Sequence, residues 1–514
     1  MAFSLLLIIS AVSGIVFSLL GRLLNLPHDD REPALVPQNI PFIGHGINLL
    51  RNGTEYYSQI AKKCNRSIFT LNLPRAKMYV VTSPSLVAAC DRCARSISFA
   101  PYVVAFAKRI MTAGETTVDL LSEDLFEDSP SGLRLETIRA MHEALKRDDL
   151  NDTMRTSLKG VLSFLDSTEV VVEGKGAPLF HWVRRFLSTV STNSLYGEQN
   201  PMKDLKIQDD FWTTDQDFGL LGLDFLPRVI APEASHAREM FFNAFRQYYA
   251  VGGLEGASRF IKARHEVNKK YGVKDEDIAH FDLGVCTALL VNTVPAMSWT
   301  LYYAFSNPTL LAQLRKGIEA VIFSSQSIHP DSTVSVNIPR IIKDVPLLES
   351  FVKEVLRVQS HGSSARYVLE DTFIDDTDGT KYLLKKNSIV TMPSALVHNS
   401  EVGWGPSAKV FKAARFLESS GNIKVHSSSY RSFGGGRAMC PGRHLATNLL
   451  MSTLLVMILR YDVDPVEGCW TEPVAKNHIS TSFLMPVKDI WVKIQPRKLS
   501  AEWEFLWEPE SSSS

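Results

Sequence analysis

The chain has 514 residues, of which 45% are hydrophobic and 21% are charged. Its 55 basic and 55 acidic residues give a formal net charge of zero, which argues against the basic surface typical of a protein that binds nucleic acid. Six cysteines in so long a chain are too sparse for a disulfide scaffold, and this usage indicates a reducing compartment.

The first 21 residues, MAFSLLLIISAVSGIVFSLLG, carry no charge and are long enough to cross a membrane as one helix. A cleaved signal peptide is the alternative, but nothing basic precedes the run and the run is long for a signal peptide. We expect residues 1–21 to be a membrane anchor, with the rest of the chain cytoplasmic because Arg22 follows it. Residues 22–45 contain four prolines, which predict a stiff hinge.

Residues 46–510 are predicted to form one mainly α domain with small β-sheets. The run SIFTLNLPRAKMYVVTSPSL alternates around a Pro-Arg turn, which predicts a hairpin and then a helix opening at Ser83. From Thr116 to Arg357 the pattern is helical, with a Pro- and Gly-rich break in GLLGLDFLPRVIAPEAS. Strand-like runs return in SARYVLEDTFI, KYLLKKNSIVTM and PVKDIWVKI.

A run of about 25 apolar residues begins at Phe281 and is long enough for a second membrane span. It is apolar nearly all round, but Asn292 and Thr293 lie at its centre, so we expect a buried core helix instead. Pro295 removes one backbone hydrogen bond and is predicted to bend this helix.

The stretch RSFGGGRAMCPGRHLA, residues 431–446, places Cys440 between three glycines and a predicted helix. Three interpretations stay open on this stretch alone: a dinucleotide loop, a tight turn with a buried thiol, and a metal thiolate. Met439 stands where the dinucleotide loop requires glycine, which disfavours the first. A cysteine just before a helix favours a thiolate, because N–H groups and the helix dipole stabilise its negative charge, and a single soft ligand on a loop is typical of haem iron.

Three motifs in the chain resemble those of the cytochrome P450 family, the haem-thiolate monooxygenases. The matching residues are Phe433, Gly436, Cys440 and Gly442 in the cysteine loop, Glu354 and Arg357 in the E-x-x-R helix, and Pro406, Phe411, Arg415 and Phe416 in P-x-x-x-x-F-x-x-x-R-F. They occur in the family's order, and the resemblance covers essentially the whole chain. It implies the cytochrome P450 fold with an N-terminal transmembrane anchor and a haem-thiolate catalytic domain over residues 46–510.

The resemblance also implies residue roles. Cys440 would be the axial thiolate of haem b, with Phe433 shielding the sulfur and Gly436 in the same cofactor-binding loop. Glu354, Arg357 and Arg415 would form a buried cluster that ties the E-x-x-R helix to this loop. Arg366 occupies the position where the family usually supplies a cation for a haem propionate.

The chain departs from the family in several motifs, among them the P-x-x-x-x-F-x-x-x-R-F motif, where Ala413 replaces the usual proline before Arg415. Ala438 replaces the usual arginine or histidine of the cysteine loop, so that Arg437 is the candidate propionate ligand there. The W-x-x-x-R helix lacks its tryptophan, which leaves His142, Lys146 and Arg147 as alternatives for cofactor binding. In the central helix the usual carboxylate is missing: Asn292 lies near the acid–alcohol position with Thr293 beside it, and both are predicted to be catalytic. The alternative for Asn292 is a core amide that caps the free carbonyl of the bent helix.

The N-T-x-P-A pattern resembles the subgroup of sterol 7α- and 12α-hydroxylases and prostacyclin synthase, which contains both monooxygenases and isomerases. We therefore expect a monooxygenase that oxidises a lipophilic terpenoid, steroid-like or polyketide-derived compound, with a reductase-independent isomerase or dehydratase as the alternative.

The expected partners are NADPH-cytochrome P450 reductase and the endoplasmic reticulum membrane. The catalytic domain is expected to be cytoplasmic and monomeric, and no nucleic acid is expected to bind. The cysteine loop also looks like those of fungal secondary-metabolism members. Pocket residues are expected in the segments 99–106, 220–226, 289–295, 361–365 and 480–483.

Overall fold

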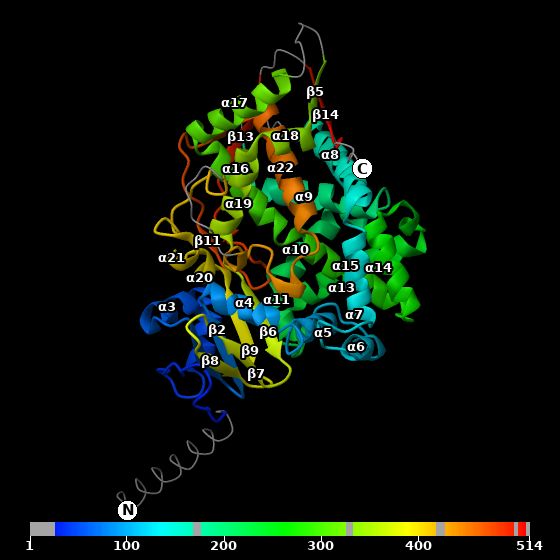
Figure 1. Ribbon diagram of the computed structural model, residues 1–514. Coiled ribbons are helices and arrows are strands. Elements are labelled where there is room, and N and C mark those ends of the chain that lie inside the picture. The colour runs from blue at the N-terminus through cyan, green and yellow to red at the C-terminus, as the bar shows by residue number, and fades with distance from the viewer. Residues whose placement is uncertain (1–25, 168–175, 325–332, 418–426, 498–501, 510–514) are drawn as a thin grey trace, which may run out of the picture.

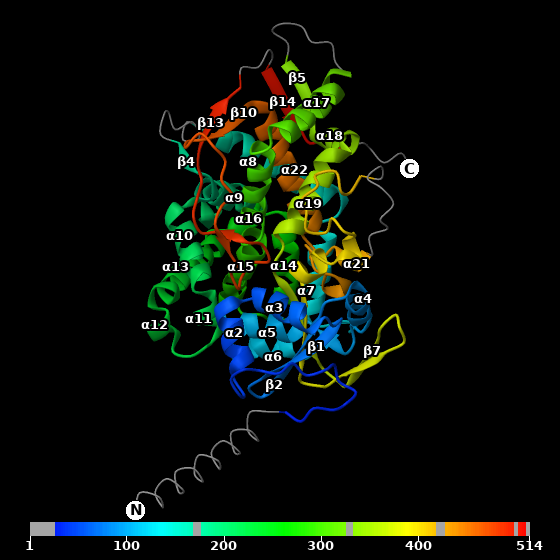
Figure 2. The same ribbon diagram turned by 90° about the vertical axis from the view of Figure 1, so that its left-hand side faces the viewer.

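The computed structural model describes residues 26–167, 176–324, 333–417, 427–497 and 502–509. The predicted anchor of residues 1–21 lies outside this part of the chain. Helices make up most of the body, and the largest sheet lies at the end where the described chain begins (Figures 1 and 2). The expectation of a mainly α fold with small sheets is therefore confirmed.

The α-helices follow one another along the whole of the described chain. They are α2 (Gly44–Asn52), α3 (Glu55–Cys64), α4 (Pro84–Arg92), α5 (Ala100–Arg109), α6 (Glu115–Ser122), α7 (Leu133–Glu143), α8 (Arg147–Asp166), α9 (Leu179–Tyr196), α10 (Leu205–Gln216), α11 (Phe218–Gly222), α12 (Pro227–Ile230), α13 (Pro232–Ala250), α14 (Arg259–Lys270), α15 (Asp275–Leu290), α16 (Thr293–Phe305), α17 (Pro308–Ser324), α18 (Ile338–Asp344), α19 (Pro346–Gln359), α20 (Ser394–His398), α21 (Glu401–Trp404) and α22 (Arg443–Arg460). Short 3-10 helices occur at Pro201–Lys203, Gly253–Gly256, Ser427–Ser429 and Gly436–Ala438.

The strands form one five-stranded sheet and several smaller ones. The large sheet has the order β1 (Ile68–Leu73), β2 (Ala76–Val81), β9 (Ile389–Pro393), β6 (Ser363–Val368) and β3 (Ile97–Ser98), and only the β2–β9 pair is parallel. A three-stranded sheet pairs β10 (Tyr461–Pro465), β13 (Trp491–Pro496) and β4 (Ala177–Pro178). Two-stranded sheets pair β7 (Thr372–Asp375) with β8 (Lys381–Leu384), β11 (Ala475–Lys476) with β12 (Met485–Pro486), and β5 (Thr333–Asn337) with β14 (Glu502–Leu506).

The predicted hairpin and the helix after it are confirmed as β1, β2 and α4. In β1–β2 the register places Leu73 opposite Ala76, so the turn is the predicted Pro-Arg pair, and Arg75 takes a positive φ there. Ser83 is the N-cap of α4, because its hydroxyl accepts a hydrogen bond from the Leu86 N–H at 3.3 Å. Local turn and capping chemistry therefore fixes this end of the sheet.

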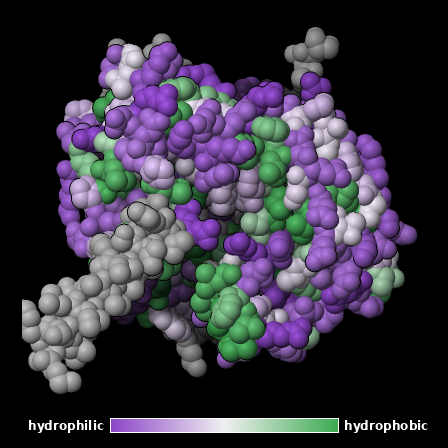
Figure 3. All heavy atoms as spheres, turned by 90° about the horizontal axis from the view of Figure 1, so that it is seen from below, coloured by the Kyte–Doolittle hydropathy of each residue, from purple (hydrophilic) through white to green (hydrophobic). Residues whose placement is uncertain are grey.

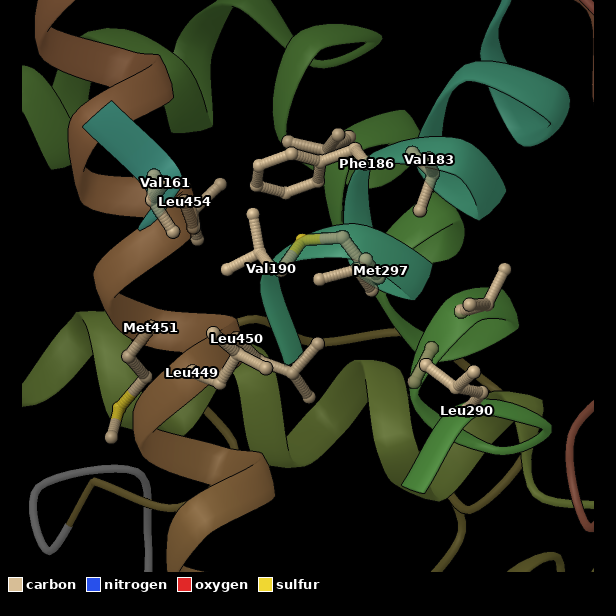
Figure 4. Packing of buried hydrophobic residues seen from close by; sticks show 14 of the residues in the cluster. Val161, Val183, Phe186, Val190, Leu290, Met297, Leu449, Leu450, Met451 and Leu454 are labelled. Carbon is tan, nitrogen blue, oxygen red and sulfur yellow. The ribbon is translucent and has the colours of Figure 1, made fainter. Parts of the chain in front are cut away.

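The main core lies between α8, α9, α15, α16, α19 and α22, whose facing apolar side chains are fully buried. Figure 4 shows Phe186 and Val190 of α9 close to Met297 of α16 and to Leu450 and Leu454 of α22. Burying each such side chain contributes about 1.5–3 kcal/mol relative to leaving it exposed. This packing holds α16 and α22, which flank the site described below, in fixed relation.

The central apolar run is a core element, as expected, but it forms two helices rather than one bent helix. Helix α15 ends at Leu290 and α16 begins at Thr293. Pro295 has no N–H, so the Val291 carbonyl loses its helical partner, and the break lies at that point. Within the described residues one helix region, Asp275–Phe305, is long and apolar enough to cross a membrane, and 67% of its apolar window is buried in the protein.

Part of the predicted hinge is held against the large sheet. The Val36 N–H donates to the Thr70 carbonyl of β1 at 2.9 Å. The Glu32 carboxylate, fully buried, pairs with Lys77 of β2 at 2.6 Å and accepts a hydrogen bond from the Tyr79 hydroxyl at 2.6 Å. The Lys77 ammonium also donates to the Pro27 carbonyl at 2.6 Å. These buried contacts fix the path of the chain as it enters the body.

Glu32→Gln removes the charge that pairs with Lys77 and keeps the shape of the side chain. A buried ammonium left without its counter-charge costs about 3–5 kcal/mol, so we expect the free energy of unfolding to fall by about that amount. Asp29→Asn is the matched control, because the Asp29–Arg31 pair is far more exposed and should contribute little. Urea unfolding of both variants measures the difference, and equal effects would contradict this role for Glu32.

Candidate active site

The loop before α22 is shaped by two glycines and one backbone hydrogen bond. Gly434 and Gly436 have φ angles of 73° and 63°, in the left-handed region that favours glycine. The Cys440 N–H donates to the Phe433 carbonyl at 3.0 Å and closes the loop. Together these features form a tight turn that ends at Cys440, three residues before α22 begins at Arg443.

The Cys440 thiol is half-buried, and burial raises its pKa. The Gly442 N–H and the Arg443 guanidinium oppose this rise, as the sequence predicts for a position before a helix, but burial outweighs them. A thiolate at this position therefore needs a further positive partner. Among the described residues no group of three or more His, Cys, Asp or Glu side chains is arranged to hold a metal ion, so Cys440 would act as a single protein ligand.

The glycine-rich part of the loop packs closely over a buried ion pair. Arg431 is buried and its guanidinium contacts the Asp91 carboxylate at 2.7 Å. A Cβ atom at Gly435 would lie 2.8 Å from an Asp91 oxygen and closer still to Arg431, so a side chain there would displace the pair. The glycines are thus required by close approach to α4 as well as by backbone conformation.

His398 connects the loop to the helix α19. Its Nε2 accepts a hydrogen bond from the Arg431 N–H at 2.7 Å, and its Nδ1 lies 2.8 Å from the Arg357 carbonyl. Burial, with the positive charge of Arg357, lowers the pKa of His398 to about 3, so the ring is neutral and Nδ1–H is the donor. The imidazole therefore bridges two backbone segments that are far apart in sequence.

The predicted Glu354, Arg357 and Arg415 side chains meet in a buried cluster. The Glu354 carboxylate accepts from Arg357 at 2.7 and 2.9 Å and from Arg415 at 2.9 Å to each oxygen. Arg357 donates to the carbonyls of His398 and Ala408 at 2.7 Å, and its guanidinium lies over the Trp404 ring. Every strong donor and acceptor in the cluster is matched, which a buried charge requires.

The two arginines predicted to bind propionates differ in environment. Arg366 is buried, lies over the Phe99 ring, and donates to its own neighbour, the Ala365 carbonyl, at 2.8 Å. Within the described part of the chain no carboxylate pairs with it, and burial lowers its pKa. Arg437 is exposed and donates to the Glu127 carbonyl at 3.3 Å. A small cavity lined by both arginines and by Gly435, Gly436 and Ala438 lies between them.

The candidates His142 and Lys146, which lie at the end of α7 and just before α8, are not equally placed. The Lys146 ammonium pairs with Glu143 at 2.6 Å on an exposed surface, so the structure does not bring it to the loop. His142 is half-buried in the last turn of α7, and burial together with the nearby Arg443 lowers its pKa. The proximity of His142 to Arg443 places it beside the start of α22.

Asn292 and Thr293 lie at the break between α15 and α16. The Asn292 Oδ1 accepts a hydrogen bond from the Ser482 N–H at 2.8 Å and from the Thr481 hydroxyl at 3.2 Å, so it holds the tip loop, residues 478–483. The alternative weighed for Asn292, an amide that caps the free carbonyl of the bent helix, would use its Nδ2 group, so it stays open beside these contacts of the oxygen. From α15 to the break, the residues that are not fully buried make a mostly apolar stripe: Phe281, Gly284, Val285, Thr287, Ala288, Leu289 and Asn292.

The tip loop also contacts the two residues just before β6, so it links the helix break to the segment that leads into the strand of Arg366. The N–H groups of His361 and Gly362 donate to the Ser482 carbonyl at 2.7 and 2.8 Å.

Sequence reasoning missed His398, Asp91 and Arg431, because a single His, Asp or Arg outside a recognised motif gives no signal of burial. It also gave no role for the Asn292–Ser482 contact, which joins segments about 190 residues apart.

In comparison with known proteins, the chain is similar to cytochrome P450 proteins. A family model described as "Cytochrome P450" matches residues 239–494. The protein "Cytochrome P450 monooxygenase nodJ" of Hypoxylon pulicicidum is 29% identical over 494 residues, which are 93% of this chain and 92% of the relative. A "Cytochrome P450 monooxygenase" of Gibberella zeae is 28% identical, over 91% of this chain and 89% of the relative. The "25-hydroxycholesterol 7-alpha-hydroxylase" of Rattus norvegicus is 27% identical, over 73% of this chain and 90% of the relative.

The low pKa of His398 predicts an acid-sensitive stability. Between the folded-state pKa of about 3 and the ordinary value of about 6.5, only the unfolded chain protonates this ring. Unfolding then takes up one proton, so the free energy of unfolding falls as the pH drops, by about 1.4 kcal/mol per pH unit from this group. We expect His398→Gln to remove that part of the slope. Urea unfolding of both proteins at about pH 7, 6 and 5 measures it, and parallel pH dependences would contradict it.

Proposed function

The chain belongs to the cytochrome P450 family and is a cytochrome P450 monooxygenase with haem as its cofactor; on that premise we propose that it hydroxylates a lipophilic small molecule with Cys440 as the axial ligand. The observation that carries this proposal is the loop in which Cys440 stands alone on a tight, glycine-built turn braced by a buried charge cluster. A loop so fixed presents one sulfur in one orientation.

The residues present fit a haem. Cys440 supplies one soft ligand, and its raised thiol pKa calls for a metal cation to hold it as a thiolate. Arg366 supplies a buried cation without a carboxylate partner in the described part of the chain, which suits a propionate. Phe433 and Gly436 would line the cofactor on the sulfur side, with Arg437 and His142 as further candidates near its edge; Lys146 is directed elsewhere.

A haem with a thiolate ligand, when bound, supplies the chemistry that cleaves dioxygen and oxidises unactivated carbon. The chain's own part is to orient the substrate and to move protons. Thr293, at the start of α16, carries a hydroxyl at the helix break, whereas Asn292 commits its amide oxygen to the tip loop and keeps only its Nδ2 group for donation. We propose Thr293 as the proton-carrying group and Asn292 as a residue that positions it.

The substrate we propose is a rigid, largely apolar molecule of the terpenoid, steroid or polyketide class, oxidised in a biosynthetic pathway. The accessible stripe of α15 is mostly apolar, which suits such a ligand. Relatives whose names refer to hydroxycholesterol 7-alpha-hydroxylation and to cholestenone 12-alpha-hydroxylation support this class. Relatives named as hydroxylases and monooxygenases do not favour the alternative of a reductase-independent isomerase.

We also propose attachment to the endoplasmic reticulum membrane, with the catalytic domain of residues 46–510 in the cytoplasm as a monomer. Residues 1–21 would form the single span and residues 22–45 the connection to the body. Apolar side chains between α11 and α13 are exposed, among them Leu223, Phe225 and Val229, and would lie at the lipid surface. Hydrophobic patches break the hydrophilic surface of the face seen in Figure 3. Electrons would come from NADPH-cytochrome P450 reductase.

The Cys440 assignment predicts a specific spectral change. Purified full-length protein should show the red-shifted Soret band of carbon-monoxide-bound thiolate haem, and Cys440→Ser should lose that band while Cys90→Ser, a buried cysteine of α4, keeps it. With reductase and NADPH, the wild-type protein should consume dioxygen and give a product heavier by one oxygen atom, measured by mass spectrometry. A band that is unchanged in Cys440→Ser would overturn the assignment, and turnover without NADPH would favour the isomerase.

The two arginines should differ in their effect on haem retention. Arg366→Ala removes a buried cation without a protein counter-charge, so we expect haem content after purification to fall several-fold, whereas Arg437→Ala, on the surface, should lose little. Lys146→Ala is the control outside the loop. Haem per protein, from absorbance, measures the effect, and a larger loss in Arg437→Ala would assign the propionate contact to that residue instead.

A further inference from the structure

Asp215 is a buried carboxyl group that the described part of the protein satisfies only in part. It lies near the end of α10, is 6% exposed, and its Oδ1 has no hydrogen-bond partner among the described residues. Burial raises its pKa, while the side chains of Ser480 and His478 oppose the rise. No ion pair with Asp215 is formed by the cations in the described part of the chain. A buried carboxyl in this condition costs stability, because its lost hydration is not replaced.

Two other buried carboxylates of the protein, Asp282 and Glu354, have partners on both oxygens. Asp282 of α15 is fully buried, forms an ion pair with Arg264, and accepts hydrogen bonds from the hydroxyls of Tyr196 at 2.8 Å and Tyr249 at 2.7 Å. Glu354 accepts from two arginines. Against these examples, an incomplete set of partners at Asp215 indicates that a group outside the chain completes it.

The surroundings of Asp215 show where such a group would lie. It adjoins the tip loop, where His478 Nε2 lies 3.3 Å from the Gln216 carbonyl and Ile479 packs close to Gly219. The same loop is bonded to Asn292 at the helix break and to the strand leading to Arg366. Asp215 thus lies beside the tip loop, and the tip loop is bonded to the break in the central helix through Asn292.

We propose that Asp215 is a substrate-binding residue that accepts a hydrogen bond from a hydroxyl or amino group of the lipophilic substrate. This rests on the proposed function, and it narrows the substrate class to molecules that carry such a donor at a distance from the carbon that is oxidised. A single polar contact in an otherwise apolar pocket fixes the end of the ligand, so the length of the ligand determines which carbon reaches the haem.

Matched probes of graded length test this without knowledge of the natural substrate. We would titrate the haem-loaded full-length protein with 1-alkylimidazoles whose chains end in methyl, hydroxyl or ammonium, since the imidazole nitrogen binds haem iron and shifts its absorption. At one chain length or two adjacent ones, the hydroxyl and ammonium probes should bind about tenfold or more tightly relative to the methyl probe, as expected of a hydrogen bond to a buried charge.

Three variants assign the preference to the carboxylate. Asp215→Asn should abolish the preference for the ammonium end, while Asp209→Asn, at an exposed position of the same helix, should leave it unchanged. Asp215→Glu should keep the preference but move it to probes shorter by about one methylene, because the longer side chain carries the carboxylate about one methylene closer to the ligand. A merely structural carboxylate would not produce that shift.

Thermal unfolding supplies an independent readout. Because Asp215 is incompletely satisfied in the free protein, Asp215→Asn should unfold at the same temperature as wild type or higher. A haem-loaded protein that shows no polar preference at any length, or one that keeps it in Asp215→Asn, overturns the proposal for Asp215 alone. A protein that binds no haem overturns the proposed function, and the assignment of Asp215 with it.

Discussion

The buried carboxylate of Glu354 is the interaction on which the rest of this structure depends. Arg357 lies one turn along the same helix, but Arg415 must be brought to the carboxylate from another segment, because charges left alone in the interior would cost several kcal/mol. Meeting that requirement fixes α19 against the segment that carries Arg415, and through His398 it fixes the backbone of Arg431. The position of the loop that ends in Cys440 therefore depends on the ion pairs of the Glu354 cluster, which reach the loop through His398 and Arg431.

The central helix meets a different constraint. Pro295 interrupts the apolar central helix, and the break lies at Asn292, a polar residue in the middle of an otherwise apolar run. The Asn292 side chain then uses its oxygen to hold the tip loop, so the break becomes a junction between the helix and the end of the chain. Backbone irregularity is thus stabilised by a long-range contact.

Much of this arrangement could be predicted from the sequence, since it rests on local signals. The hairpin at Arg75 and the helix start at Ser83 follow from turn and capping chemistry, and proline chemistry locates the irregularity at Pro295, although a bend was expected there and the helix breaks in two. The cluster of Glu354, Arg357 and Arg415 follows from the resemblance to the family's motifs. The roles of His398 and Asp215 could not be predicted, because they depend on which segments meet in space. The Cys440 thiol was expected to be stabilised as a thiolate, but burial, which sequence does not report, has the larger effect.

The contact between the tip loop and the rest of the molecule has an evolutionary consequence. The loop and α10 share no residue with the Glu354 cluster or the cysteine turn, and the loop is bonded to the helix break through Asn292 and Ser482. Mutations in α10 or in residues 478–483 can therefore change ligand preference without loosening the parts that hold Cys440. Descendants of such a chain are free to diversify in what they recognise while their reaction stays the same.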